Sequence, residues 1–143
     1  DEICSAVIHL SSRKEGALIV IQRSSDLTLH LQGSTKLNSD IFGPLIEATF
    51  HKDNSMHDGG MYIAIGRIRA VRCVLPVTQR NDIPAELGMR HRAALGLAEK
   101  TDALIIVVSE ETGLISIAMD GELHRGIATN DLQEIVEKEL KPR

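Results

Sequence analysis

Two short runs of almost only apolar residues constrain the fold of this chain more than any other feature. They are "ALIVIQ" (17–22) and "ALIIVV" (103–108), and each has the length of a strand rather than of a helix. A strand that is apolar on both sides is buried on both faces, as happens in a sheet that is covered by helices. The sequence therefore predicts two buried strands, the first of them central, with helices packed on their sheet.

Five further strands are predicted from apolar alternation and from turn signals. Tight turns are expected at Gly66-Arg67 and at Asp120-Gly121, and strands joined by such turns are antiparallel. Other strands are separated by helices and can be parallel, so we expect a mixed sheet of about seven strands. The five strands are "LTLHLQ" (27–32, a hairpin partner of 17–22), "MYIAIG" (61–66), "IRAVRCVL" (68–75), "LISIAM" (114–119) and "ELHRGIA" (122–128).

Apolar residues at helical spacing predict about four helices that flank this sheet. We expect Gly16 to end the first helix, Ser39-Asp40 to cap the second, and Thr129 or Asn130 to cap the last. The result is an α/β fold with α+β character, not a simple alternating β-α nucleotide fold. The helices are predicted at 2–14, 41–51, 89–100 and 129–140, with a loop or short helical turn at 81–88.

The 143 residues fit a single domain, 1–143, whose core must be aliphatic because only 2% of the residues are aromatic. The same scarcity argues against a single-strand nucleic-acid binder, which stacks bases on aromatic rings. A net charge of −4 argues against a general polyanion-binding surface. Any phosphate chemistry must therefore be local.

The two cysteines, Cys4 and Cys73, match no metal-binding spacing, so we expect both to be reduced and the protein to be cytoplasmic. No apolar run approaches the ~18 residues of a membrane span. The chain does not begin with Met and can be part of something longer. Membrane contact is therefore expected only through a segment that this chain does not include.

A histidine, an aspartate and two glycines stand together in His57-Asp58-Gly59-Gly60, at the start of the strand 61–66. An imidazole and a carboxylate suit a divalent metal, and Asp58 can orient an attacking hydroxyl. Glycines let a ligand approach the backbone closely. The alternative is a plain turn in which Asp58 caps the backbone, because Asp-Gly is a common turn pair.

The sequence Arg90-His91-Arg92 opens the predicted helix 89–100. Cationic groups are unfavourable at a helix N-terminus unless an anion is bound, because the helix dipole there favours negative charge. Two guanidinium groups and free backbone N–H groups would grip a polyphosphate. The alternative is a solvated basic patch that pairs with Glu86 or Glu99.

A third polar cluster, Ser109 to Gly113, follows the buried strand 103–108. Its hydroxyl can contact phosphate and its carboxylates can reach a metal, while the alternative is a polar hairpin turn. The chain has no GxxxxGK[ST] loop, no GxGxxG after a strand and no GxSxG motif. Together the three clusters supply the parts of a site for a nucleoside triphosphate and a metal, since phosphoryl transfer mainly needs positioning and charge neutralisation.

These motifs, in this order, resemble the diadenylate cyclase family, which makes cyclic di-AMP from two ATP molecules. The family's Asp-Gly-Ala and Arg-His-Arg motifs appear here within "MHDGG" (56–60) and "GMRHRAA" (88–94). The segments "GALIVIQR" (16–23) and "TDALIIVVSEETGLISIAMDGELHR" (101–125) are also similar, so the resemblance covers essentially the whole chain. It implies the diadenylate cyclase fold, a mixed sheet of about seven strands flanked by helices.

The resemblance also implies a role for each site residue. Asp58 would activate the ribose 3′-hydroxyl that attacks the α-phosphate of the other ATP, and Arg90-His91-Arg92 would bind the triphosphate. If each domain holds one ATP, catalysis needs a face-to-face homodimer, because the product is symmetric. The residues Gly59, Gly60, Leu75, Met89 and Ser109 would contact ATP, and His57 and Glu111 would bind Mn²⁺ or Mg²⁺.

The chain departs from the family pattern at two positions within these motifs. Gly60 stands where alanine is usual, and Met89 stands where threonine is common. Neither change removes a charged group, but both can lower activity. The sequence therefore leaves a second hypothesis open: a catalytically weak or inactive module that binds ATP or cyclic di-AMP and acts in regulation.

Overall fold

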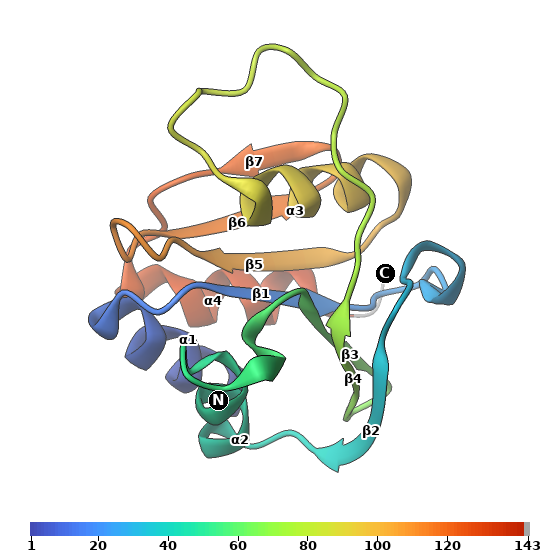
Figure 1. Cartoon of the computed structure of the whole chain (residues 1–143), viewed down its shortest axis with the longest axis vertical. Helices are drawn as coiled ribbons and strands as arrows, with labels where there is room; N and C mark the ends of the chain where they lie inside the picture. The colour runs from blue at the N-terminus through green and yellow to red at the C-terminus, as the bar shows by residue number, and fades with distance from the viewer. Residues whose placement is uncertain (142–143) are drawn as a thin grey trace.

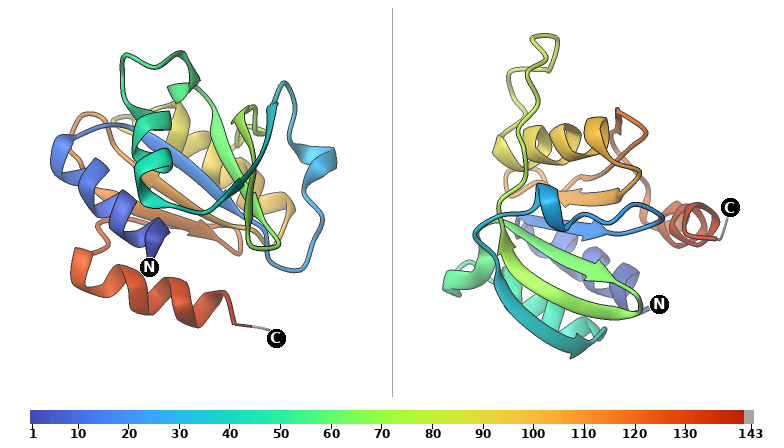
Figure 2. Two further views of the ribbon diagram at one scale, coloured as in Figure 1. Left: turned by 90° about the horizontal axis from the view of Figure 1, so that it is seen from below. Right: turned by 90° about the vertical axis from the view of Figure 1, so that its right-hand side faces the viewer.

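Seven strands form one mixed sheet with helices on both of its faces (Figure 1, Figure 2). The computed structural model describes residues 1–141, and the strands lie in the order β2-β4-β3-β1-β5-β6-β7. The predicted fold class is confirmed. The strands are β1 (Ala17–Ile21), β2 (Thr35–Asp40), β3 (Gly60–Ala64), β4 (Arg67–Cys73), β5 (Leu104–Val108), β6 (Ile115–Met119) and β7 (Glu122–His124). The helices are α1 (Glu2–Arg13), α2 (Gly43–Phe50), α3 (Met89–Lys100) and α4 (Thr129–Glu139), with short 3-10 helices η1 (Thr28–His30) and η2 (Ser55–His57).

Strands β1 and β5 form the centre of the sheet, as their apolar sequences predict. Ile19 of β1 lies opposite Met61 of parallel β3 and opposite Ile106 of antiparallel β5. Every residue of β1 and β5 is buried. The other strand pairs within residues 1–141 are antiparallel, so the β1–β3 contact gives the sheet its mixed character.

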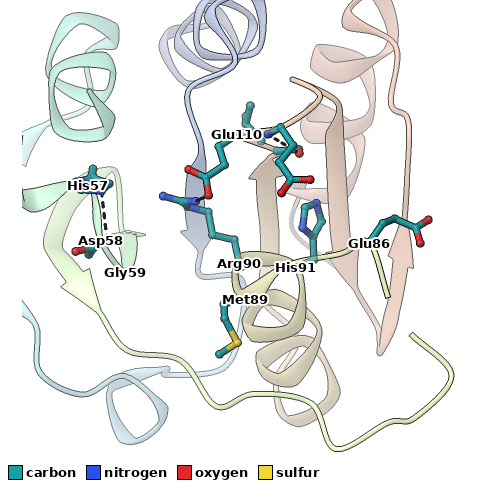
Figure 3. Close-up of a pocket in the computed structure, with 12 residues that line it drawn as sticks. His57, Asp58, Gly59, Glu86, Met89, Arg90, His91 and Glu110 are labelled. Atoms are coloured by element: carbon teal, nitrogen blue, oxygen red, sulfur yellow. Dashed lines mark hydrogen bonds and ion pairs between the residues drawn. The ribbon is translucent and has the colours of Figure 1, made fainter. Parts of the chain in front are cut away.

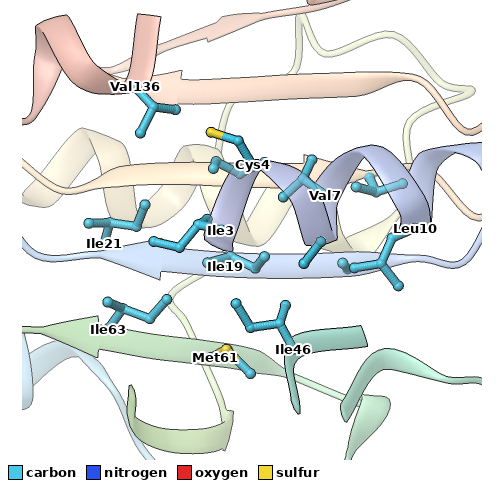
Figure 4. Packing of buried hydrophobic residues seen from close by; sticks show 14 of the residues in the cluster. Ile3, Cys4, Val7, Leu10, Ile19, Ile21, Ile46, Met61, Ile63 and Val136 are labelled. Carbon is cyan, nitrogen blue, oxygen red and sulfur yellow. The ribbon is translucent and has the colours of Figure 1, made fainter. Parts of the chain in front are cut away.

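The two faces of the sheet carry separate layers of core residues. Along β1, Ile19 and Ile21 face one layer, whereas Leu18 and Val20 face the other. Helices α1, α2 and α4 cover the first face, and Figure 4 shows α1 lying along β1 there. Helix α3 covers the second face, on the opposite side of the sheet from α1 (Figure 2). Because successive side chains of a strand point to opposite faces, each central strand contributes to both layers.

The predicted strand 27–32 is wrong. Thr28–His30 form η1 instead, and Leu29 is 89% exposed. The missing strand is β2, which comes later in the chain and pairs antiparallel with β4 at the edge of the sheet. Leu37 is the one strongly apolar residue of β2, so the hydrophobic pattern does not reveal this strand. An edge strand that is half open to solvent needs no stronger pattern.

The predicted cap of the second helix is also wrong. Ser39-Asp40 belong to β2, and α2 begins later, at Gly43, after Phe42 and without a side-chain cap. Pro44 lies in the first turn of α2. Proline suits that position because the first N–H groups of a helix have no partner within the helix. The helix therefore starts at a glycine–proline pair and not at the serine and aspartate before it.

Other boundaries differ from prediction by a few residues. Helix α1 ends before Lys14, which adopts the left-handed conformation (φ 54°) that was expected to be needed at Gly16. The turn between β3 and β4 lies at Ile65-Gly66, both with positive φ, one residue earlier than predicted. Helix α4 follows Ala128 without a side-chain cap, and β7 already ends at His124.

The pairing of the central strands brings distant segments to one edge of the sheet. Because β1 is parallel to β3 and antiparallel to β5, the starts of β1 and β3 lie beside the end of β5. The residues just before β3 and just after β5 are therefore close in space. The first turn of α3 lies at the same edge.

Candidate active site

The three polar clusters predicted from the sequence meet in a cleft at this edge of the sheet (Figure 3). The cleft has a volume of about 420 Å³, within the range of pockets that take one small ligand. Its walls are the segment before β3, the start of α3 and the turn after β5. The predicted residues that line it are His57, Asp58, Gly59, Met89, Arg90, His91, Ser109 and Glu111.

Three predicted site residues do not line the cleft. Gly60 and Leu75 are buried and adjoin each other, because a Cβ added at Gly60 would lie 3.2 Å from Leu75 Cδ1. Arg92 lies on another side of α3 from the cleft. Its Nε donates to the carbonyl of Leu87 at 3.3 Å and its Nη2 to the carbonyl of Pro84 at 3.5 Å.

Two carboxylates that were not predicted as site residues also line the cleft. Glu110 was named only within its polar cluster, yet its Oε1 lies 3.7 Å from Nη1 of Arg90. Glu86 comes from the long loop before α3, which carries no pattern from which a position could be predicted, and it pairs with Arg125 at 3.5 Å. Gly88 and Val108 complete the lining.

The wall before β3 presents an imidazole and a carboxylate side by side. Nδ1 of His57 lies 2.7 Å from the carbonyl of Asn54, an acceptor, so Nδ1 carries the hydrogen. In the neutral ring Nε2 then has the lone pair, and it lies 3.3 Å from Oδ1 of Asp58. The side chain of Asp58 is 82% exposed and accepts no backbone hydrogen bond within residues 1–141, so it does not act as a turn cap.

Gly59 is required by the backbone beneath it. It has a φ of 78°, and a Cβ would lie 2.8 Å from the carbonyl carbon of Arg72 and from the carbonyl oxygen of Cys73. Backbone atoms cannot move aside as a flexible side chain can. Any other residue at Gly59 would therefore push the wall that holds His57 and Asp58 away from β4.

Arg90 lies in the middle of the cleft, between His57 and Asp58 on one side and His91 on the other (Figure 3). Its guanidinium fits against Gly16 at the start of β1, where a Cβ would lie 2.5 Å from Nη1. The ion pair of Arg90 with Glu110 is long, at 3.7 Å, and Glu110 is 68% exposed, so this pair is weak. A phosphate could displace Glu110 and accept hydrogen bonds from a guanidinium that is already in place.

His91 is a buried histidine with two cations nearby. Burial lowers the pKa of the His91 imidazole below its usual value, and the positive charges of Arg125 and Arg90 lower it further. The residue is only 7% exposed, yet it also lines the cleft. A neutral imidazole there can donate or accept a single hydrogen bond without adding charge.

The turn after β5 is organised by the side chain of Ser109. Its Oγ accepts hydrogen bonds from the backbone N–H groups of Glu111 and Thr112, each at 3.2 Å. This is the polar turn that the sequence allowed as an alternative. The hydroxyl hydrogen remains available to donate into the cleft, so the turn and a ligand contact are compatible.

The donor set of the cleft fits a divalent metal that shares its ligands with a substrate. Nε2 of His57 and Oδ1 of Asp58 face each other as two acceptors, an arrangement that a cation between or beside them would stabilise. Glu111 lines the same cleft. Within residues 1–141 no three metal-ligating side chains gather in one cluster. Mg²⁺ commonly takes one or two protein ligands and completes its shell with phosphate and water.

The sequence matches the profile of the DAC family, described as "DisA bacterial checkpoint controller nucleotide-binding", over residues 4–123. This match spans most of the 143 residues, and the chain belongs to this family.

None of the helices within residues 1–141 has both the length and the apolar character that crossing a membrane requires.

The curated relatives carry names of one activity. The chain is 47% identical over 122 residues to "Diadenylate cyclase CdaS" of Bacillus thuringiensis, which covers 85% of this chain and 61% of that protein. It is 37% identical over 141 residues to "Cyclic di-AMP synthase CdaA" of Bacillus subtilis, covering 99% of this chain and 52% of that protein. The chain thus spans little more than half the length of these relatives.

Solved structures share the fold. A cysteine double mutant of DacA from Staphylococcus aureus matches with a TM-score of 0.93 at 35% identity, over 96% of this chain and 92% of that one. A hypothetical membrane spanning protein from Bacillus cereus matches with a TM-score of 0.85 at 45% identity, over 88% of this chain and 62% of that one. The recognition of the diadenylate cyclase family from its motifs is confirmed.

Proposed function

We propose that the chain is a single diadenylate cyclase domain, 1–143, that condenses two ATP molecules into cyclic di-AMP and two pyrophosphates. One observation carries the proposal: side chains suited to a hydroxyl nucleophile and to a triphosphate, from three distant segments, line one cleft. The names of the relatives support it. In each half of the reaction a ribose 3′-oxygen bonds to the α-phosphorus of the other ATP, and the bond from that phosphorus to pyrophosphate breaks.

Asp58 is proposed to orient the attacking 3′-hydroxyl and to accept its proton. Its carboxylate is 82% exposed, so it can reach a hydroxyl that a second molecule brings to the cleft. Gly59 leaves no side chain between this carboxylate and a nucleotide. Positioning of this kind is the main contribution that a protein makes to phosphoryl transfer.

The start of α3 is proposed to bind the triphosphate. Arg90 offers a preplaced guanidinium, and Gly88, the N-terminal flank of α3, carries no side chain that caps the first N–H groups. Those N–H groups and the helix dipole favour an anion. Neutral His91 and the hydroxyl of Ser109 would add single hydrogen bonds to phosphate oxygens. Met89, which is 65% exposed, would touch the nucleotide through its side chain.

The three residues outside the cleft have supporting roles in this proposal. Arg92 would hold the loop that carries Glu86 by bonding its carbonyls. Gly60 and Leu75 pack together at the β3–β4 pair and would shape the nucleotide site from within. They contact ATP only if ATP enters more deeply than the cleft described above.

A divalent ion, Mn²⁺ or Mg²⁺, would be held by His57 with Asp58 or Glu111 and by phosphate oxygens. When bound, such an ion neutralises phosphate charge and makes the α-phosphorus more electrophilic. The hydrogen bond from Nδ1 of His57 to the carbonyl of Asn54 orients the ring so that Nε2 lies beside Oδ1 of Asp58.

The symmetry of the product requires two copies of the cleft. One cleft of about 420 Å³ suits one nucleotide, and each ATP must supply both a nucleophile and an electrophile. We therefore propose that two domains meet face to face, at least transiently, with their clefts opposed.

A cyclase assay over a range of protein concentrations tests the proposal. With ATP and Mn²⁺ or Mg²⁺, cyclic di-AMP measured by chromatography should appear at a rate that rises with the square of protein concentration when the dimer is weak. Asp58→Asn should abolish turnover and leave most of the ATP affinity. The absence of product across metals and concentrations would contradict the proposal.

A second function, a regulatory module that binds ATP or cyclic di-AMP with little turnover, is favoured by Gly60 and Met89. A methyl group at Gly60 would lie 3.2 Å from Leu75 Cδ1 and 3.4 Å from Leu18 Cδ2, both flexible side-chain ends. Gly60→Ala should therefore fit at small cost. If binding is found without turnover, the double variant Gly60→Ala, Met89→Thr should gain activity; a double variant that stays inactive would argue for the regulatory module.

A further inference from the structure

A second cavity adjoins the cleft on the far side of Arg90. It has a volume of about 640 Å³ and shares His57, Arg90 and Glu110 with the cleft. Its remaining lining comes from the end of α1, the start of β1 and the residues after α2. Apart from these shared residues, none of the predicted site motifs contributes to its lining. Arg90 is therefore a common wall between two spaces.

A buried carboxylate without a hydrogen-bond partner lines this second cavity. The side chain of Glu15 is 10% exposed, and its Oε1 accepts no hydrogen bond from any residue in 1–141. Its ion pairs are long: Nη1 of Arg13 lies 3.8 Å from Oε1, and Nε2 of His51 lies 4.0 Å from Oε2. A buried carboxylate left in this way costs stability. Because Oε1 is enclosed by the protein, a ligand in the cavity would recover part of that cost by donating a hydrogen bond to Oε2.

Cationic groups around Glu15 point to an anionic ligand. Lys14 and Lys52 line the cavity and form no salt bridge within residues 1–141. Among the described residues, Glu110 is the one ion-pair partner of the Arg90 guanidinium, at 3.7 Å, whereas Arg13 pairs with Glu47 at 2.9 Å. Two ammonium groups and one loosely paired guanidinium thus line the same cavity as a carboxylate that needs a donor.

We propose that the second cavity binds a phosphate group that still carries a proton, with pyrophosphate as its ligand. The lysines and Arg90 would neutralise the anion, and its P–OH would donate to the Glu15 carboxylate. Sulfate has lost both protons at neutral pH, so Glu15 would repel it. Pyrophosphate keeps one proton there, whereas a phosphomonoester has a second pKa of about 6 and is mostly deprotonated. This chemistry favours released pyrophosphate over the terminal phosphate of bound ATP.

The assignment rests on the proposed function, because only that reaction would supply pyrophosphate beside Arg90. The leaving group would then pass from one side of the Arg90 guanidinium to the other. The substrate side of the cleft would be cleared without the nucleotide having to move. Glu15 and Lys52 would act as binding residues for the product and not as catalytic residues.

Calorimetric titration of the whole chain with inorganic phosphate, sulfate and pyrophosphate tests the assignment. The wild type should bind phosphate at least about tenfold more tightly than sulfate, and Glu15→Gln should reduce that preference about tenfold, because the amide no longer repels an unprotonated anion. Lys52→Ala should weaken pyrophosphate binding about tenfold. The matched controls Glu134→Gln and Lys100→Ala make the same charge changes at exposed helix positions. They should leave the preference for phosphate over sulfate and the pyrophosphate affinity unchanged.

The assignment would be overturned if Glu15→Gln had the same ratio of phosphate affinity to sulfate affinity as the wild type. It would also be overturned if Lys52→Ala bound pyrophosphate as tightly as the wild type. A non-hydrolysable ATP analogue distinguishes the sources of the phosphate. Simultaneous binding of the analogue and pyrophosphate supports a separate product site, whereas strict competition assigns the cavity to the tail of ATP and overturns the product site. These titrations need no turnover. A chain without cyclase activity would therefore contradict the proposed function, while the titrations would still test the anion site.

Discussion

The two sides of the first turn of α3 carry similar side chains and do different things. Arg90 faces the cleft, in contact with Gly16 and Glu110, while Arg92 bonds the carbonyls of Pro84 and Leu87 in the loop before the helix. Residues two apart on an α-helix lie about 200° apart around its axis, so they cannot serve the same ligand from the same face. The three-residue motif is thus divided between the cleft on one side and the loop before the helix on the other.

Removing Arg90 should have the largest effect on this contrast. Arg90→Ala is expected to weaken binding of a non-hydrolysable ATP analogue about a hundredfold, because two charge-assisted hydrogen bonds to phosphate are lost. The melting temperature should barely change, since Glu110, its partner, is exposed. Calorimetry and thermal unfolding measure both. Arg92→Ala is the matched variant, and an equal loss of affinity in the two would mean that both arginines bind the nucleotide.

The packing of Arg90 against β1 can be tested without touching the arginine. In Gly16→Ala the new Cβ would lie 2.5 Å from Nη1 and 2.7 Å from Cζ of Arg90, so the guanidinium must move. Because the end of a flexible side chain moves cheaply, we expect ATP-analogue affinity to fall about tenfold with little change in the unfolding free energy. Gly43→Ala is the control, because Gly43 lies outside the cleft and its new Cβ would come no closer than 3.4 Å to its neighbours. Unchanged affinity in Gly16→Ala would show that Arg90 binds ligand from another rotamer.

The loop side of the helix should respond in stability. Arg92→Ala is expected to lower the unfolding free energy by about 1 kcal/mol, because two long hydrogen bonds to carbonyls are lost. Hydrogen exchange of the Leu87 amide, which donates to the carbonyl of Pro84 at 3.1 Å, should quicken in this variant and keep the wild-type rate in Arg90→Ala. Equal exchange in the two variants would remove the distinction between the sides.

His91, which lies between the two arginines, should give the smallest effect, and it depends on pH. Its pKa is lowered in the folded state, first by burial and then by Arg125 and Arg90. The unfolded chain therefore binds a proton first as pH falls, so stability is full above pH 6.5 and decreases below it until the folded-state pKa is passed. Urea unfolding on both sides of pH 6.5 should show a smaller loss in His91→Asn than in the wild type. An identical pH dependence would assign the loss to other groups.

Strong local patterns explain what the sequence revealed. The runs 17–22 and 103–108 became β1 and β5, and the helix predicted at 89–100 became α3 with the same bounds. The Asp120-Gly121 turn joins β6 to β7 with positive φ at both residues, as predicted. In each case one periodicity or one turn pair determines the local structure, and tertiary packing agrees with it.

What the sequence could not reveal depends on packing between distant segments. The direction of Arg92 is set by which face of α3 lies on the sheet, where Ala94 and Leu97 are buried. Edge strand β2 has too few apolar residues to show a period. The cavity beside Glu15 exists only because the ends of α1 and α2 meet there, and neither end carries a recognisable motif.

The pairing of β1 with both β3 and β5 has a consequence for the order of events during synthesis. The segment before β3, which forms one wall of the cleft, is synthesised before β5 and the turn after it. Strand β1 can therefore complete its pairing only after β5 has been synthesised. Contacts between segments so far apart in the chain form slowly, since a long loop must close first. The cleft of a nascent chain would therefore stay incomplete until β5, the last central strand, is in place.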